Sequence, residues 1–405
     1  MECLLAAGVK RELKAGAGNA LNEFQDFINS TIHRSDPDNL PRQSCGQPGC
    51  WLFGHLGYDL KNEIENLTTS KISGIQFPDL FFFEPEIVVR LTRDEMVIEA
   101  DDPKVIFDNI TATSLSHLIF SKEPVPLIQS RLSKEEYINT IKKLQWHILR
   151  GDCYEINFCQ EFFAEQTIID PVTVYKKLSA VSPNPFSALY KMNNQWLICA
   201  SPERFLKKQG NKILSQPIKG TSKRIGGDTD KDELSKDELL YSAKDRSENV
   251  MVVDLVRNDL AKVCKEGTVQ VDELYGIYSF PQVHQMISTV SGELKEDMSF
   301  TDIIKAAFPM GSMTGAPKLK VMELIEKYEQ TKRGIFSGAV GYISPDGNFD
   351  FNVVIRSIMY NADAPYLSFQ TGSGITFYSD PEKEWEECLL KAGAIKTVLE
   401  DSNDL

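Results

Sequence analysis

The feature that most limits the possible folds is a long succession of strand patterns from residue 154 onward. These segments lie at residues 154–162, 187–192, 196–200, 211–214, 268–271, 288–294, 338–343, 351–359 and 366–369. Few helical patterns separate one strand from the next, so most of the strands are expected to pair as antiparallel neighbours. The pattern predicts an α+β fold rather than a doubly wound parallel sheet.

Helices are predicted where caps and helical periodicity coincide. Ser133 and Glu136 have the spacing of a capping box, and an apolar stripe follows over 138–149. A long, charge-rich helical pattern covers 232–264, and a last helix is expected over 381–399. These helices are expected to cover the sheets.

The first part of the chain is expected to form a smaller α/β portion that packs on the rest. Residues 87–91 and 96–100 have the pattern of a hairpin. The segment 121–126 contains two prolines and is the predicted boundary. We therefore divide the chain into an N-terminal portion, 1–125, and a catalytic region, 126–402.

Composition argues against several classes of protein. The formal net charge of −14 over 405 residues disfavours binding to nucleic-acid backbones, which needs clustered Lys and Arg. No apolar run reaches the roughly 18 residues of a membrane span, and the N-terminus lacks the order of a secretory signal. We therefore expect a cytoplasmic protein that binds neither nucleic acid nor membrane.

Cysteine usage suits a reducing compartment. The eight cysteines are scattered along the chain, which is typical of reduced thiols rather than of a disulfide framework. Cys45 and Cys50 lie near His33 and His55, but their spacing matches no strong zinc pattern. We therefore do not expect zinc there.

One lysine, Lys219, lies in a stretch that restricts its position. Pro217 fixes its own φ angle, and Gly220 permits the backbone to approach another group closely. Such a stretch is able to aim one amine at a chosen point; a surface turn that happens to contain lysine is the alternative. Upstream, 154–162 alternates strictly and predicts a half-buried strand whose polar face, including Glu155, looks into a site.

Two helical segments each contain carboxylates three residues apart. The pairs are Asp245 with Glu248 and Glu384 with Glu387. Residues at this spacing are neighbours on a helix surface, and like charges there cost stability unless a cation lies between them. Carboxylate oxygens suit Mg²⁺. The sequence is therefore compatible with a Mg²⁺ site, and a solvated acidic face is the alternative.

Candidate anion-binding groups are also present. The glycine-rich loop 308–318 opens a helix, and 371–374 reads as a second turn of small residues; both are able to present backbone N–H groups to a carboxylate. Arg356 is a candidate carboxylate clamp, with an edge-exposed arginine as the alternative. His284 is either a general acid–base residue or a hydrogen-bonded core histidine.

Several motifs, taken together and in order, resemble the chorismate-utilising enzyme family. They span roughly residues 130–400 and are 151–157 (GDCYEIN), 201–205 (SPERF), 217–221 (PIKGT), 245–249 (DRSEN), 253–260 (VDLVRNDL), 315–318 (GAPK), 351–356 (FNVVIR) and 384–388 (EWEEC). Residues 51–60 resemble the N-terminal region of the aminating members more loosely. The resemblance implies a large antiparallel core of two packed sheets surrounded by helices.

Within that family, the central motif distinguishes the reactions. Members that make anthranilate resemble this chain but have alanine where Lys219 stands, whereas lysine there is similar to members that aminate ring carbon 4 of chorismate. Isochorismate- and salicylate-forming members have a water-activating lysine at the position of Glu155. The resemblance implies amination of chorismate to 4-amino-4-deoxychorismate, the first step toward 4-aminobenzoate and folate. Anthranilate formation and a non-catalytic chorismate-binding subunit are the alternatives.

The resemblance also implies catalytic roles. Lys219 is the expected nucleophile at ring carbon 2, Glu203 the acid that protonates the departing hydroxyl, and His284 a residue near the leaving group. An amine nucleophile must be neutral, so we expect burial and a nearby Mg²⁺ to lower the pKa of Lys219. Protonation by Glu203 requires a raised pKa at that carboxyl.

Metal and substrate ligands follow from the same resemblance. Glu248 and Glu387 match the Mg²⁺ ligands, with Asp245 and Glu384 as outer or water-mediated partners. Arg356 and the Gly374 backbone are expected to hold the enolpyruvyl carboxylate. The full predicted substrate-binding set is Arg356, Gly374, Lys391, Thr314, Gly220 and Thr221.

The chain departs from the family pattern at two positions and lacks one motif. Met310 stands where a glycine is usual, and Phe336 replaces a tyrosine that contacts carboxylate in some members, which affects loop shape and one hydrogen bond. The chain contains no nucleophile elbow of the glutamine amidotransferase kind. A separate amidotransferase subunit is therefore the expected source of ammonia.

Overall fold

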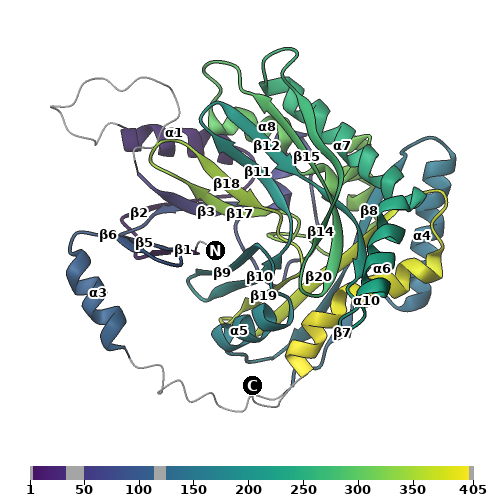
Figure 1. Ribbon diagram of the computed structural model, residues 1–405, viewed down its shortest axis with the longest axis horizontal. Coiled ribbons are helices and arrows are strands. Elements are labelled where there is room, and N and C mark those ends of the chain that lie inside the picture. The colour runs from purple at the N-terminus through teal and green to yellow at the C-terminus, as the bar shows by residue number, and fades with distance from the viewer. Residues whose placement is uncertain (1–2, 33–49, 114–124, 401–405) are drawn as a thin grey trace.

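The computed structural model describes residues 3–32, 50–113 and 125–400, and its strands form three sheets (Figure 1). The seven-stranded sheet has the order β16 (Gly315–Ala316), β8 (Glu155–Glu165), β20 (Tyr366–Ile375), β19 (Ser357–Asn361), β10 (Gln195–Ser201) and β9 (Phe186–Met192), with β7 (Gln129–Ser130) beside β8. The ten-stranded sheet has the order β13 (Ile218–Lys223), β15 (Val283–Glu293), β12 (Lys212–Gln216), β11 (Arg204–Gln209), β18 (Phe349–Asn352), β17 (Ala339–Ile343), β3 (Leu52–Leu56), β4 (Leu80–Glu84) and β2 (Arg11–Ala15), with β14 (Gln270–Ser279) beside β15. The small sheet contains β1 (Cys3–Ala7), β5 (Ile87–Leu91) and β6 (Met96–Glu99).

Helices cover the outer surfaces of these sheets (Figure 1). They are α1 (Ala20–Ile32), η1 (Tyr58–Leu60), α2 (Lys61–Ile64), α3 (Pro103–Ala112), α4 (Lys134–Leu149), α5 (Pro171–Val181), α6 (Thr229–Tyr241), α7 (Ala243–Val263), α8 (Phe300–Ala307), η3 (Gly311–Met313), α9 (Lys318–Tyr328) and α10 (Pro381–Glu400). The capping box predicted from Ser133 and Glu136 begins α4, and the hairpin β5–β6 and the last helix are also confirmed. Paired antiparallel strands with surrounding helices confirm the α+β class.

Strand β8, which lies between β16 and β20, corrects one prediction. It was expected to be half-buried, but Glu155 through Ala164 are all buried. Its apolar face, with Ile156 and Phe158, belongs to a core shared with α4 and α10, whereas Cys159 on the other face belongs to the core between the two large sheets. Because helices cover one face and a second sheet covers the other, the polar face looks into the interior rather than into solvent.

The chain passes between the two large sheets at two adjacent places. It leaves β10 for β11 at residues 202–203, and it leaves β18 for β19 at residues 353–356. The Ser201 hydroxyl donates to the Val353 carbonyl at 2.6 Å, and the Val353 N–H donates to the Glu203 carbonyl at 3.0 Å. The single strand predicted over 351–359 is therefore wrong: it is two strands in different sheets, with the left-handed residue Arg356 (φ 51°) at the crossing.

Two further predictions are corrected. The helical pattern over 232–264 is two helices, because Ser242 is extended (φ −61°, ψ 112°) and caps α7 by accepting from the Asp245 N–H at 3.2 Å. Residues 371–374, expected to form a turn, continue β20 and pair with residues 157–160 of β8. Small residues fit this strand because a Cβ at Gly372 would lie only 2.0 Å from the Phe158 carbonyl oxygen.

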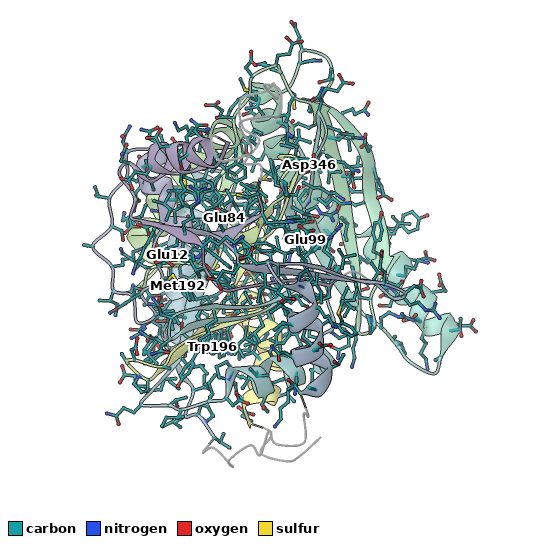
Figure 2. The ribbon with its side chains drawn as sticks, turned by 90° about the vertical axis from the view of Figure 1, so that its left-hand side faces the viewer. Glu12, Glu84, Glu99, Met192, Trp196 and Asp346 are labelled. Atoms are coloured by element: carbon teal, nitrogen blue, oxygen red, sulfur yellow. The ribbon has the colours of Figure 1, made fainter. Side chains whose placement is uncertain are left out.

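The N-terminal strands extend the main sheet. Strand β3 pairs with β17, so residues before position 125 belong to the same ten-stranded sheet as later ones. Figure 2 shows Glu12 and Glu84 of this sheet above Met192 and Trp196 of the seven-stranded sheet. Most of the predicted boundary segment lies outside the described residues, and the division at 125 stays a prediction.

One buried ion pair ties the two sides of the interior together. Arg333 and Glu329 form a pair with a 2.6 Å contact, and both side chains are almost fully buried. Arg333 also donates to the Met313 and Asn157 carbonyls, while Glu329 accepts from the Cys159 N–H at 2.9 Å. The pair therefore connects β8 with the loop that precedes α9.

We predict that Arg333→Met destabilises the protein by about 3–5 kcal/mol, because it leaves the Glu329 carboxylate buried without its cation. Denaturant unfolding measures this loss. Lys320→Met removes an exposed ion pair with Glu323 on α9 and serves as the control, with an expected loss below about 1 kcal/mol. Equal losses in the two variants would contradict the structural role given to Arg333.

Candidate active site

A β-bulge orients Lys219. Strands β12 and β13 pair with β15 in one continuous register as far as Ile218, and the register then shifts between Ile218 and Thr221. Gly220 lies inside this shift with φ +92°, a conformation that glycine adopts without strain. The Lys219 side chain is about 10% exposed. The predicted alternative, a surface turn, is therefore wrong, because Lys219 belongs to a strand and points into the molecule.

Lys219 forms an ion pair with Glu155 across the two large sheets. Its Nζ donates to Glu155 Oε1 at 2.7 Å, and the Glu155 side chain is only 2% exposed. Gly374 of β20 lies against both groups: a Cβ there would be 2.8 Å from the Lys219 amine and 2.5 Å from the Glu155 carboxylate. A glycine at this position therefore leaves the space that the ion pair occupies.

The pKa of Lys219 moves in the direction opposite to the expected one. Burial alone would lower the pKa, but the carboxylates of Glu155, Glu248 and Glu203 outweigh burial and raise it above its usual value. In the metal-free protein these carboxylates favour the ammonium form of Lys219, and the lowered pKa expected with Mg²⁺ nearby stays a prediction. Nucleophilic use of Lys219 requires that it first transfer a proton.

Glu203 and Arg356 lie at the two adjacent crossings between the sheets. Glu203 is buried, and burial raises the pKa of its carboxyl to about 7, although Ser312, Lys219 and Arg356 partly offset this effect. Burial also lowers the pKa of Arg356, and the Glu203 charge partly compensates. Within the described part of the chain, the guanidinium of Arg356 makes no hydrogen bond or close ion pair. It is therefore available to an anion.

The predicted metal ligands come together from α7 and α10, which lie on the right in Figure 1. Glu248 and Glu384 are buried, and each has an oxygen with no hydrogen-bond partner among the described residues. Lys244 lies between them, with its Nζ 3.8 Å from Glu248 Oε1 and 3.7 Å from Glu384 Oε1. A second lysine, Lys391, pairs with Glu387 at 2.8 Å.

These carboxylates suit Mg²⁺ by chemistry but are not closed around an ion. No group of three His, Cys, Asp or Glu residues with metal-binding geometry occurs among the described residues. Burial raises the pKa of Glu248 to about 7, and Lys219 and Lys244 partly offset the rise. For Glu387, burial acts in the same direction, but Lys391, Lys244 and Lys219 outweigh it and lower the pKa. The donor set and the unpartnered buried oxygens fit a hard divalent ion.

The glycine-rich loop closes one side of this region. Gly315 pairs with Ile156 of β8, and a Cβ on Gly315 would lie only 2.1 Å from the Glu155 carbonyl oxygen. Thr314 is fully buried and its hydroxyl donates to the Met310 carbonyl at 3.1 Å, so it shapes the loop. Met310 and Phe336, the departures from the family pattern, are both buried in the core between the sheets.

Other predicted site residues lie farther from Lys219 or are engaged elsewhere. His284 is buried, and its ring nitrogens contact Ser279 Oγ at 2.8 Å and Asp232 Oδ1 at 3.1 Å. Thr221 is exposed on β13. Lys391 donates to the Gly372 carbonyl at 2.9 Å, which places it near the end of β20 beside Gly374. The catalytic role of His284 stays a prediction.

Sequence reasoning missed two ion-pair partners of the predicted site residues. Glu155 was noted as part of a polar strand face and as the position of a lysine in other members, but not as the partner of Lys219, and Lys244 was not considered. The unfavourable spacing of Glu248 from Asp245 could have pointed to a nearby cation such as Lys244. Of the residues weighed as a zinc site, His33 and Cys45 lie outside the described residues, and His55 contacts the Tyr190 hydroxyl and the Pro78 carbonyl as a core histidine.

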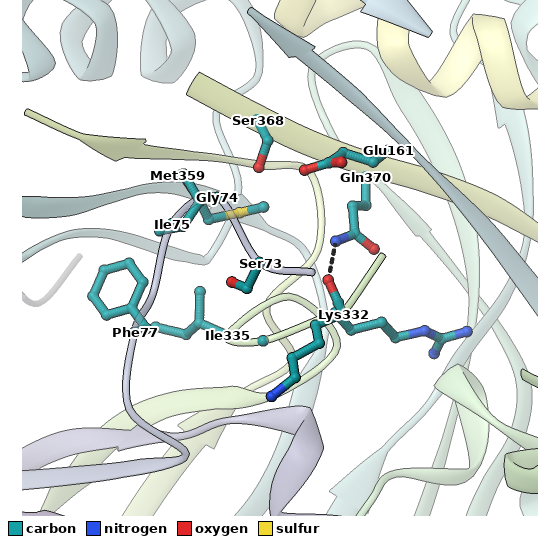
Figure 3. A pocket seen from close by; sticks show the side chains of 12 residues that line it. Ser73, Gly74, Ile75, Phe77, Glu161, Lys332, Ile335, Met359, Ser368 and Gln370 are labelled. Atoms are coloured by element: carbon teal, nitrogen blue, oxygen red, sulfur yellow. Dashed lines mark hydrogen bonds between the residues drawn. The ribbon is translucent and has the colours of Figure 1, made fainter. Parts of the chain in front are cut away.

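A separate small cavity lies at the far end of the polar face of β8 (Figure 3). It has a volume of about 10 Å³, room for about one water molecule. Glu161, Lys332 and Gln370 are among its lining residues, and Gln370 donates to the Lys332 carbonyl at 3.1 Å. None of the predicted site residues lines it, so this cavity is separate from the region around Lys219.

Comparison with known proteins identifies the family. Residues 3–397 match the family described as chorismate binding enzyme. This chain belongs to the chorismate-binding enzyme family. It is 35% identical to an anthranilate synthase component I-like protein of Synechocystis over 91% of this chain and 75% of that protein. It is 34% identical to aminodeoxychorismate synthase component 1 of Klebsiella aerogenes over 86% of this chain and 77% of that protein.

Some relatives are much longer. The chain is 35% identical to the chloroplastic aminodeoxychorismate synthase of Arabidopsis thaliana over 94% of its own length but only 44% of that protein. Among solved structures, it resembles anthranilate synthase component I of Streptococcus pneumoniae with a TM-score of 0.82 and 23% identity, over 98% of this chain and 92% of that one. This likeness confirms the fold of two packed sheets. No described helix has the length and apolar character needed to cross a membrane.

We predict that Glu203→Gln changes stability in a pH-dependent way. The folded-state pKa of about 7 exceeds the ordinary 4.5, so the native protein keeps this proton to higher pH than the unfolded chain. Stability is therefore lost as pH rises from about 4.5 to about 7. Glutamine does not titrate, so the variant lacks this loss, which amounts to at most about 3 kcal/mol of the free energy of unfolding. Denaturant unfolding at pH 5 and pH 8 measures it.

The exposed Glu266→Gln is the matched control for the chemical change. Relative to the wild type, Glu203→Gln is expected to be more stable at pH 8 than at pH 5. A difference that is the same at both pH values would show that Glu203 is not held protonated by burial.

Proposed function

We propose that this chain aminates chorismate at ring carbon 4, as component I of an aminodeoxychorismate synthase. The observation that supports this proposal most is the position of Lys219, a buried amine between the two sheets in a region that also contains Glu203 and Arg356. Relatives named aminodeoxychorismate synthase component 1 support the same reaction class. The resemblance stated above associates lysine at this position with amination at carbon 4.

Substrate binding is assigned to Arg356 and to the carboxylates of α7 and α10. Arg356 is able to hold one carboxylate of chorismate through two parallel N–H donors. Glu248 and Glu387 would hold Mg²⁺, with Asp245 and Glu384 as outer partners, and the bound ion would neutralise the second carboxylate and withdraw electrons from the ring. The backbone at Gly374 lies close enough to the Lys219 amine to help place the ring next to it.

The first half of the reaction needs a neutral amine. Lys219 transfers a proton to Glu155, whose Oε1 is 2.7 Å away. The neutral amine attacks carbon 2 and forms a C–N bond, both double bonds of the ring diene shift by one position toward carbon 4, and the C–O bond at carbon 4 breaks. Glu203, whose pKa is raised to about 7 by burial, gives its proton to the departing hydroxyl, which leaves as water.

The second half of the reaction returns Glu155 and Glu203 to their starting protonation states. Ammonia attacks carbon 4, both ring double bonds shift back to their original positions, and the C–N bond to Lys219 breaks, which releases a neutral lysine. The new ammonium group at carbon 4 gives a proton to Glu203, and Glu155 returns its proton to Lys219. His284 has no step here, because Asp232 and Ser279 engage both of its ring nitrogens. A separate glutamine amidotransferase subunit, in a cytoplasmic setting, is the proposed source of ammonia.

We predict that chorismate, ammonium and Mg²⁺ together give aminodeoxychorismate without release of pyruvate, and that Lys219→Ala lowers the rate by about 10³-fold or more. Chromatography of the products measures both. Lys208→Ala is the matched control, because Lys208 is a half-buried strand lysine that donates to the Gly347 carbonyl away from the site.

Two outcomes would contradict the proposed function. Anthranilate with release of pyruvate would assign the chain to the anthranilate-forming members, with Lys219 as a remnant. Binding of chorismate with no turnover by the wild type, or unchanged turnover by Lys219→Ala, would favour the non-catalytic subunit or a reaction that does not use this lysine.

A further inference from the structure

Among the described residues of the site, Lys244 alone forms ion pairs with both acidic helices, α7 and α10. It lies in the first turn of α7, and its Nζ is 3.8 Å from Glu248 Oε1 on the same helix. The same nitrogen is 3.7 Å from Glu384 Oε1 on α10. One ammonium group therefore occupies the space between a predicted metal ligand and a predicted outer partner.

The Lys244 ammonium lies among the negatively charged carboxylates of the predicted metal site. Glu248 and Glu384 are both buried, and each has a carboxylate oxygen within 4 Å of the Lys244 ammonium, at 3.8 Å and 3.7 Å. A hard divalent ion needs the same oxygens. Since like charges this close are tolerated only with a cation among them, Lys244 supplies the compensating charge in the metal-free protein.

The contacts of Lys244 are weak enough for a metal ion to replace its ammonium group. Both N–O distances exceed normal hydrogen-bond length, and the Lys244 side chain is 55% exposed, whereas those of Glu248 and Glu384 are 11% and 3% exposed. The ammonium can therefore move into water along its flexible stem while the carboxylates keep their places. Glu248 Oε1 and Glu384 Oε2, which have no hydrogen-bond partner among the described residues, gain most from a new cation.

We propose that Lys244 is a built-in competitor of Mg²⁺: its ammonium holds Glu248 and Glu384 in the metal-free protein and must leave before the ion binds. The inference rests on the Mg²⁺ assignment made in the proposed function, and adds that this residue sets the affinity of the site. The lysine keeps α7 and α10 in place without metal and weakens metal binding in return.

The test is metal binding by the whole chain without substrate. Mg²⁺ is titrated by calorimetry and Mn²⁺ by loss of the free-ion paramagnetic resonance signal. Lys244→Met is expected to bind both ions about threefold to tenfold more tightly than the wild type, because one competing unit charge is gone. Lys244→Arg, which keeps the charge, is expected to stay within about twofold of the wild type.

Lys262→Met is the matched control. Lys262 lies on the same helix, is 54% exposed and pairs with Asp259, so its removal changes net charge equally without touching the site. Its affinity for both ions is expected to equal that of the wild type. Circular dichroism confirms that each variant is folded.

The remaining outcomes overturn the inference in distinguishable ways. Equal or weaker metal binding by Lys244→Met, with clear binding by the wild type, shows that Lys244 does not compete with the ion and leaves the proposed function intact. Tighter binding by Lys262→Met of the same size shows a general charge effect instead. Absence of binding by all the proteins removes the Mg²⁺ assignment itself.

Discussion

The site depends on two strand crossings that are bound to each other. The hydrogen bonds from Ser201 Oγ to the Val353 carbonyl and from the Val353 N–H to the Glu203 carbonyl lock the passage from β10 to β11 against the passage from β18 to β19. These passages place Glu203 and Arg356 in the interior between the large sheets. Because backbone groups there cannot continue either sheet ladder, the crossings satisfy them locally and leave the side chains free for chemistry.

Charge is the second constraint on the interior. Lys219 is held by Glu155 and is further stabilised as an ammonium by Glu248 and Glu203, so the resting site is stable but unreactive toward an electrophile. On the proposed function, a divalent cation held by Glu248 and Glu387 would offset the negative charge of these carboxylates and so favour the neutral amine. On this account, the same groups that stabilise the metal-free protein restrain its nucleophile until the site is filled.

The sequence allowed the local features to be predicted but not the long-range ones. The capping box at Ser133 and the last helix depend on neighbouring residues, and both were predicted correctly. The apolar segment over 351–359 has strand character throughout, so nothing local reveals that Arg356 turns the chain into another sheet. Lys219 and Glu155 are 64 residues apart, and their pairing follows only from how the two sheets pack.

The central claim is that Lys219 forms a covalent bond to the substrate. Intact-mass measurement of the Mg²⁺-loaded protein after addition of chorismate without ammonia tests it most directly. The account predicts an added mass equal to chorismate minus one water, located on the peptide that contains Lys219 and absent from Lys219→Ala. Turnover with ammonia by a wild-type protein that never gains this mass, even when the reaction is quenched rapidly, would contradict it.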